Sequence, residues 1–143
     1  MEKDTWIACA PFESLLHMHI HEAGDGAATL SMPFLPQFAQ GAGLMHGGAL
    51  VSLADTALAM AIKSLLSPGT HFGTIEAHTH FLAPVGQGTV TAKAQITGRE
   101  GRELYGAAQV EDEQGRAVLH FEATFKQAKA KKEEHGKEGL KGL

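Results

Sequence analysis

The chain has few of the features that crosslinked, nucleic-acid-binding or membrane-spanning proteins need. Cys9 is the single cysteine among 143 residues, so no disulfide can form within the chain, which suits a reducing compartment. Aromatic residues make up 6% of the sequence and the formal net charge is -4, which argues against a nucleic acid partner. The apolar run over residues 49–66 is too short and too rich in Ala, Ser and Thr for a membrane span. Residues 1–6 lack a signal-peptide pattern, so we expect a cytoplasmic protein.

The length fits one domain, but charge is spread unevenly along it. The sequence after Phe125 is rich in lysine, and the part before it is acidic. A lysine-rich tail could bind a nucleic acid or a membrane, but Glu133, Glu134 and Glu138 lie among the lysines, as in a solvated terminus. We therefore expect one domain over residues 1–126 and a disordered tail over residues 127–143.

Several segments alternate apolar and polar residues, and turn residues bound each of them. Strands are expected over residues 17–21, 27–32, 72–82, 89–97, 103–111 and 117–126, with a short helical turn over residues 11–16. One helix stands among these strands, without regular alternation of strand and helix. The pattern predicts an α+β domain in which an antiparallel sheet of about five or six strands packs against one long helix.

The expected helix, over residues 49–66, carries one carboxylate in an apolar environment. Its apolar face consists of Leu50, Leu53, Ala54, Ala57, Leu58, Ala61 and Leu65. Asp55 lies off the small polar arc of the helix, with Val51, Leu58, Ala59 and Ile62 as its neighbours. Such a carboxylate is a candidate base or nucleophile, or alternatively accepts a hydrogen bond from a backbone amide of a nearby loop.

The start of this helix, His46-Gly47-Gly48, is the second half of a candidate site. Glycine lets a ligand approach the backbone, and the first amides of a helix can hold a phosphate or the oxyanion of a thioester. The alternative is a plain glycine-rich turn. Gly47 and Asp55 lie about 12 Å apart along a helix, so one carbonyl cannot contact both within one chain. A site that uses both residues would be shared across a two-fold dimer.

The stretch from residue 40 to residue 57 resembles the hotdog-fold acyl-CoA thioesterases of the PaaI type, from phenylacetate pathways. The family pattern is Asn-x-x-Gly-x-x-His-Gly-Gly followed by a helix with Leu-x-Asp. Here His46-Gly47-Gly48, Gly43 and Ser52–Ala57 match the pattern, and Gln40 stands where the family commonly has Asn. The resemblance covers about residues 16–126. It implies a hotdog fold, in which the sheet wraps around the central helix.

The resemblance also implies hydrolysis of acyl-CoA thioesters to a free acid and CoA. Asp55 would act as general base or nucleophile, and the Gly47 amide would polarise the thioester carbonyl. His46 would help to position the substrate or water, and Gln40 would orient the carboxylate or its water. Thr74 falls where the family has Ser or Thr near that carboxylate. Aromatic, short-chain and medium-chain acyl groups all fit the pattern.

Other residues are candidates for binding the substrate. Gly43 and Gly48 belong to the matched pattern, and Phe38 lies in a loop whose apolar residues either line an acyl pocket or plug the core. Arg99 and Arg102 flank one turn and are candidates for the CoA phosphates, with scattered surface arginines as the alternative. The family further implies a homodimer with shared active sites, possibly a dimer of dimers, without a cofactor or metal. A non-catalytic hotdog protein that binds an acyl-CoA or aromatic ligand is the alternative function.

Two histidine-rich strands offer further polar groups. His17, His19 and His21 share one face of the first expected strand, which suggests either a metal site or, more simply, a solvated strand face. In the strand over residues 72–82, alternation places Thr74, Glu76, His78 and His80 on one face, and Ile75, Ala77, Thr79 and Phe81 on the other.

Overall fold

The computed structural model describes residues 3–129, which contain six strands, one long helix and three short helical segments. The lysine-rich tail beyond residue 129 lies outside the described residues. In chain order the elements are α1 (Lys3–Trp6), α2 (Pro11–Leu15), β1 (His19–Gly24), β2 (Ala27–Pro33), η1 (Pro36–Phe38), α3 (Gly47–Lys63), β3 (Phe72–Phe81), β4 (Thr89–Glu100), β5 (Glu103–Glu111) and β6 (Ala117–Gln127).

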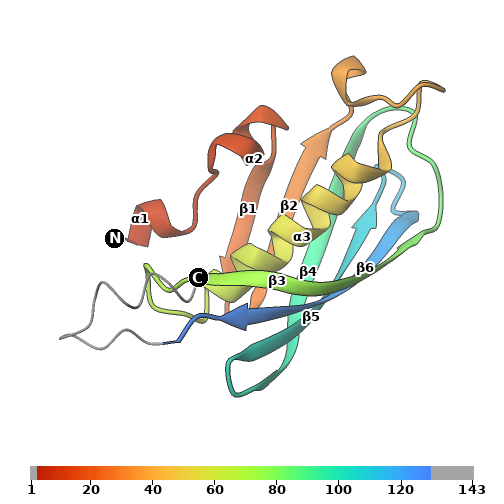
Figure 1. The fold of residues 1–143 in the computed structure, drawn as a ribbon. Helices are drawn as coiled ribbons and strands as arrows, with labels where there is room; N and C mark the ends of the chain where they lie inside the picture. Colours follow the sequence, from red (N-terminus) through yellow and green to blue (C-terminus); the bar gives the residue numbers. More distant parts are fainter. Residues whose placement is uncertain (1–2, 130–143) are drawn as a thin grey trace.

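The six strands form one antiparallel sheet in the order β1-β2-β4-β5-β6-β3. Figure 1 shows the sheet curling around α3, with the short helices α1 and α2 beside the β1 edge. The predicted α+β fold, an antiparallel sheet with one long helix against it, is confirmed. The order leaves β1 and β3 as edge strands, each with one side free of a strand partner within residues 3–129.

The helix α3 supplies much of the hydrophobic core. Eight of its residues are buried: Leu50, Leu53, Ala54, Ala57, Leu58, Met60, Ala61 and Ile62. It begins two residues before the predicted start and ends at Lys63, so Leu65, predicted to belong to the apolar face, lies beyond the helix and is exposed. No helix within residues 3–129 is long and apolar enough to cross a membrane.

The sheet approaches α3 closely at Gly106 in β5. A Cβ atom at Gly106 would lie 2.6 Å from Leu58 Cδ2 and 3.1 Å from the Gln95 carbonyl oxygen. Leu58 is fully buried, so its side chain has little space into which it can move. The absence of a side chain at Gly106 therefore sets how deeply α3 sits in the sheet.

We expect Gly106→Val to lower the free energy of unfolding by about 1–3 kcal/mol, because added methyl groups would overpack this contact. The measurement is urea unfolding at neutral pH. Gly73→Val is the matched control, because a Cβ at Gly73 in β3 would have no neighbour within 4 Å. Equal losses for the two variants would contradict the close contact between α3 and β5.

A β-bulge interrupts the regular alternation of β3. Thr74 pairs with Phe125 and Glu76 pairs with Thr124, so Ile75 is an extra residue between two successive pairs. Phe125 is buried in the core that contains α3, which places Thr74 on the helix side of the sheet. Glu76 and the histidines after it lie on the outer face. The prediction that Thr74 shares their face is wrong, because one inserted residue reverses the alternation.

Candidate active site

Asp55 and Thr74 meet where α3 lies against the beginning of β3. Thr74 Oγ1 donates a hydrogen bond of 2.9 Å to Asp55 Oδ1. Asp55 is half-buried, and its desolvation raises the pKa of the carboxyl group, while the Thr74 hydrogen bond opposes that rise. The sequence predicts apolar neighbours for Asp55 along the helix; in the structure the Thr74 hydroxyl group also donates a hydrogen bond to it. A carboxylate with a raised pKa is suited to accept a proton.

The raised pKa predicts that Asp55→Asn stabilises the protein at neutral pH. Below the ordinary aspartate pKa of 3.8 the carboxyl group is protonated in both states, and the cost of ionising it in the fold is absent. As the pH rises through the interval between the unfolded and the folded pKa, the unfolded chain releases the proton more readily, and wild-type stability falls. Asparagine does not ionise and keeps an oxygen for Thr74. We expect a higher urea midpoint than wild type at pH 7, and no difference below pH 3.8.

Asp112→Asn, in the turn between β5 and β6, is a control with the opposite sign. Backbone hydrogen bonds, from Arg116 above all, lower the pKa of Asp112. Its ionised form therefore stabilises the fold at neutral pH, and this contribution is lost as the pH falls through the folded pKa. A lower urea midpoint for Asp112→Asn and a higher one for Asp55→Asn are expected at pH 7. If both substitutions moved the urea midpoint in the same direction, the raised pKa of Asp55 would be contradicted.

The other half of the site is the N-terminus of α3. His46 is the N-cap residue, and its Nδ1 accepts a hydrogen bond of 2.8 Å from the Gly48 amide. The proton of the neutral imidazole therefore lies on Nε2. No hydrogen bond within residues 3–129 is donated by the Gly47 amide. The capped helix thus presents Gly47 as its open donor, at the positive end of the helix dipole.

Phe81, at the end of β3, lies against this donor. A Cβ atom at Gly47 would lie 2.9 Å from Phe81 Cε1 and 3.3 Å from Cζ, so only glycine fits here without a shift of the ring. The Phe81 side chain is 61% exposed despite its size. Phe81 was predicted as a strand residue but not as a site residue; the end of its strand before Ala83 and Pro84 was the signal that could have pointed to it.

Gln40 and Gly43 shape the loop that precedes α3. The Gln40 side-chain oxygen Oε1 accepts hydrogen bonds from the amides of Ala42 and Leu44, and the Gln40 carbonyl accepts one from Gly43. Gly43 has a φ of 86°, in the left-handed region that favours glycine. Within residues 3–129 no hydrogen bond joins Gln40 to Asp55. Phe38, from the same loop, is buried in the core of the chain.

The two candidate phosphate-binding arginines already have hydrogen-bond partners. Arg99 Nη2 donates to Gln127 Oε1 at 2.7 Å, Arg99 Nε donates to the Gly101 carbonyl, and Arg102 Nη1 donates to the Gln127 carbonyl at 3.1 Å. They tie the β4–β5 hairpin to the end of β6. Arg99 also stands in one cross-strand row with Leu104, Phe125 and Thr74. Three strand spacings separate Arg99 from Thr74, or about 14 Å.

The histidine-rich segments are not arranged as metal ligands. His19 and His21 pack edge to face with ring centroids 4.4 Å apart, and His21 Nε2 lies 2.6 Å from Ser31 Oγ. Across residues 3–129 no group of three or more His, Cys, Asp or Glu side chains could hold a metal ion. His78 contacts Glu76 at 3.2 Å on the outer face of the sheet, away from Asp55.

An antiparallel sheet curled around one long helix, with a carboxylate on that helix, defines a hotdog-fold protein. The sequence model of the thioesterase superfamily matches residues 42–128 of the 143 residues. The chain therefore belongs to the thioesterase superfamily, in its PaaI-type group. The superfamily supports thioester hydrolysis as the general class of reaction. A search of curated proteins gives no significant match.

Solved structures agree with this assignment. The PaaI protein from the phenylacetic acid degradation operon of E. coli is 27% identical, with a TM-score of 0.78 over 85% of this chain and 86% of that chain. The conserved protein PA5202 from Pseudomonas aeruginosa is 25% identical, with a TM-score of 0.81 over 89% and 99%. A mutant of the phenylacetic acid degradation protein PaaI from Thermus thermophilus is 25% identical, with a TM-score of 0.75 over 82% and 98%.

Proposed function

We propose that the protein hydrolyses acyl-CoA thioesters to a free acid and CoA. The observation that carries the proposal is the half-buried Asp55 carboxylate on α3, which has a raised pKa and a hydrogen bond from Thr74. Membership of the thioesterase superfamily supports the reaction class. In our proposal Asp55 is the general base or nucleophile, and the Gly47 amide polarises the thioester carbonyl.

In the general-base route, Asp55 takes a proton from water while the water oxygen adds to the thioester carbon. The carbonyl oxygen becomes an oxyanion, which the Gly47 amide and the positive end of α3 stabilise. The carbon–sulfur bond then breaks, and the thiolate of CoA leaves and takes up a proton. In the nucleophilic route, Asp55 itself adds to the carbon, the carbon–sulfur bond breaks with departure of the CoA thiolate, and water hydrolyses the resulting mixed anhydride. Thr74 occupies Oδ1, so Oδ2 of Asp55 is the oxygen available for either step.

The two groups belong, in our proposal, to different subunits of a homodimer. Asp55 contacts Thr74 near the N-terminal end of β3, and Gly47 lies against Phe81 at its C-terminal end. In a two-fold antiparallel pair of β3 strands, the beginning of one strand lies beside the end of the other. That pairing would bring Asp55 of one subunit toward Gly47 of its partner, twice in each dimer.

The exposure of β3 supports this pairing. As an edge strand it has unpaired backbone groups on one side, and it carries the apolar side chains of Ile75, 55% exposed, and Phe81, 61% exposed. Leu82, directly after the strand, is 55% exposed. An unpaired edge strand that also exposes apolar side chains is a liability in a monomer, and a second copy of the strand would cover it. Two such dimers could associate further into a dimer of dimers.

The remaining site residues take supporting roles in the proposal. His46 holds the helix start in shape through Gly48 and presents its Nε2 proton toward substrate or water. The fixed side-chain oxygen of Gln40 leaves its amide nitrogen to orient the partner's carboxylate or its water. Arg99 and Arg102 would meet the CoA phosphates beyond the Asp55–Thr74 pair. Gly43 keeps the loop in the required shape.

A non-catalytic protein that binds acyl-CoA or an aromatic ligand is the alternative. The observation that favours it is that the Gln40 oxygen is used by its own loop, at the position where the family commonly has Asn. A thiol-release assay with aromatic, short-chain and medium-chain acyl-CoA esters separates the two functions. Release of CoA at many turnovers per site supports the enzyme, and binding without release supports the alternative.

In the same assay, we expect Asp55→Asn to lower kcat by about 10²-fold or more, the scale of general-base catalysis, with the fold intact. The substitution keeps size and polarity and removes the charge that takes up the proton. Asp25→Asn, in the exposed turn between β1 and β2, serves as the control for loss of a carboxylate elsewhere. A kcat near the wild-type value would remove Asp55 from the chemistry.

Mixing two inactive variants tests whether the active site is shared. The first is Asp55→Asn; the second is Gly47→Val, whose side chain would occupy the place of the carbonyl and contact Phe81. With free exchange about half of the dimers are mixed, and one of the two sites in each mixed dimer is wild type. We expect recovery of up to about a quarter of wild-type activity. Proven subunit exchange without recovered activity would rule out a shared site.

A further inference from the structure

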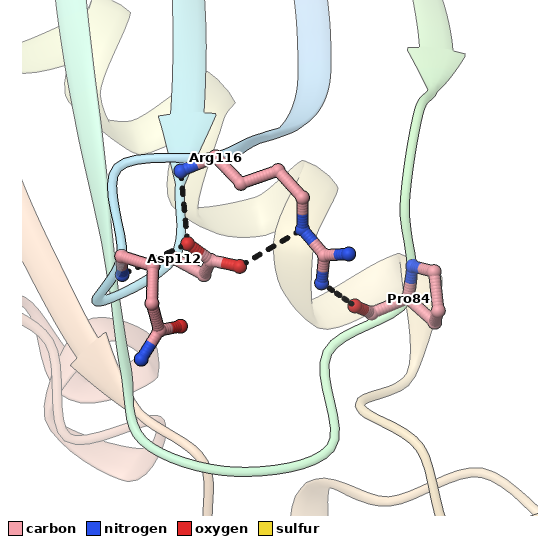
Figure 2. A network of polar contacts seen from close by, with 4 residues as sticks. Pro84, Asp112 and Arg116 are labelled. Atoms are coloured by element: carbon pink, nitrogen blue, oxygen red, sulfur yellow. Dashed lines mark hydrogen bonds and ion pairs between the residues drawn. The ribbon is translucent and has the colours of Figure 1, made fainter.

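An ion pair in the turn between β5 and β6 reaches across to the connection between β3 and β4. Arg116 Nε donates to Asp112 Oδ2 at 3.0 Å, and Arg116 Nη2 donates to the Pro84 carbonyl oxygen at 3.2 Å. Figure 2 shows the guanidinium group lying between these two acceptors. The other carboxylate oxygen of Asp112, Oδ1, accepts hydrogen bonds from the backbone amides of Gln114 and Arg116. The turn thereby holds Arg116 in the position from which it reaches Pro84.

The connection held by Arg116, residues 82–88, is in turn joined to the loop that leads into α3. The Val85 carbonyl accepts a hydrogen bond of 2.8 Å from the Met45 amide, and both residues are buried. The Gly88 carbonyl accepts one of 2.8 Å from the Phe34 amide at the beginning of the same loop. Met45 directly precedes His46, the N-cap residue of α3.

The same short segment contacts the helix start from a second side. Phe81 directly precedes the connection, and its ring lies against Gly47. Residues 81–85 therefore contact the first residue of α3 through Phe81, and contact Met45, the residue before its N-cap, through Val85. Pro84, the residue that Arg116 holds, lies between these contacts. Proline has no amide hydrogen, so its carbonyl is its one backbone group for a hydrogen bond.

We infer that Arg116 is a positioning residue: by fixing Pro84 it sets where residues 81–85 hold the N-terminus of α3 and its open Gly47 amide. The catalytic consequence of this inference depends on the proposed thioester hydrolysis. A donor to an oxyanion must lie within a narrow distance of it, and a displacement of about 1 Å can cost a large factor in rate. Arg116 would thus affect kcat without contacting the substrate.

The chemistry of arginine suits this role. Its planar fork donates to two acceptors at once, whereas the single nitrogen of lysine cannot span both.

The Asp112 partner remains charged well into the acid range, because the backbone amide of Arg116 above all lowers its pKa. The carboxyl group of Asp55 has a raised pKa, so it titrates before the ion pair is lost. The acid limb of a pH–rate profile should therefore report Asp55 in both wild type and the Arg116 variants.

The experiment compares Arg116→Ala and Arg116→Lys with Lys93→Ala in the full chain. Lys93 in β4 pairs with Glu111 in β5 at 3.2 Å, and within residues 3–129 this ion pair does not involve residues 82–88. Its removal therefore breaks a surface ion pair of a different part of the sheet. We expect both Arg116 variants to lose kcat by about tenfold, with KM within about twofold of wild type. The Lys93 variant should retain wild-type kcat. A melting temperature within a few degrees of wild type is expected for all three.

Hydrogen exchange of the Met45 amide supplies a readout that does not require turnover. It should be about tenfold faster in Arg116→Ala than in wild type and unchanged in Lys93→Ala, while the Val90 amide in the β2–β4 region stays unchanged. Unaltered exchange at Met45, or a kcat for Arg116→Ala within twofold of that for Lys93→Ala, overturns the inference. If wild type releases no CoA from any ester, the proposed function fails, and the exchange rates alone decide whether Arg116 positions the helix start.

Discussion

The burial of α3 inside the curled sheet is the constraint on which the rest of the structure depends. The helix contributes eight buried residues to one core, and the missing side chain at Gly106 lets it sit close to β5. A helix enclosed in this way leaves little surface on which a charged group can be solvated. Asp55 lies at the margin of this enclosure, half-buried and with a single hydroxyl donor, and its raised pKa is the electrostatic result.

The edge strand β3 connects the two halves of the candidate site. Its beginning supplies Thr74 to Asp55, and its end places Phe81 against Gly47. Both contacts lie on the helix side, although regular alternation over seven residues would place Thr74 and Phe81 on opposite faces. The extra residue Ile75 shifts the alternation by one residue, so that Thr74 and Phe81 lie on the same face. The bulge is therefore what allows one strand to serve both ends of the helix.

Much of the fold could be predicted from the sequence, because it depends on periodicity. The long helix, the strand segments and the antiparallel sheet follow from the spacing of apolar residues and turn residues, and Asp55 stood out as a charge among apolar neighbours. The bulge could not be predicted in this way, since an inserted residue is visible only through the pairing of β3 with β6. Leu65 was assigned to the helix because its spacing fits, but the helix ends at Lys63. Thr74 was identified through the family, although its face was predicted wrongly.

The contact between Gly47 and Phe81 has a consequence for how this sequence can vary. An aromatic ring at position 81 and any side chain at position 47 compete for the same space. The two positions, 34 residues apart in the chain, should therefore evolve as a coupled pair. A larger residue at position 47 would be tolerated only on a background that had already lost the ring at position 81. The order in which the two changes arise would then decide whether a lineage keeps a helix start that is open to a ligand.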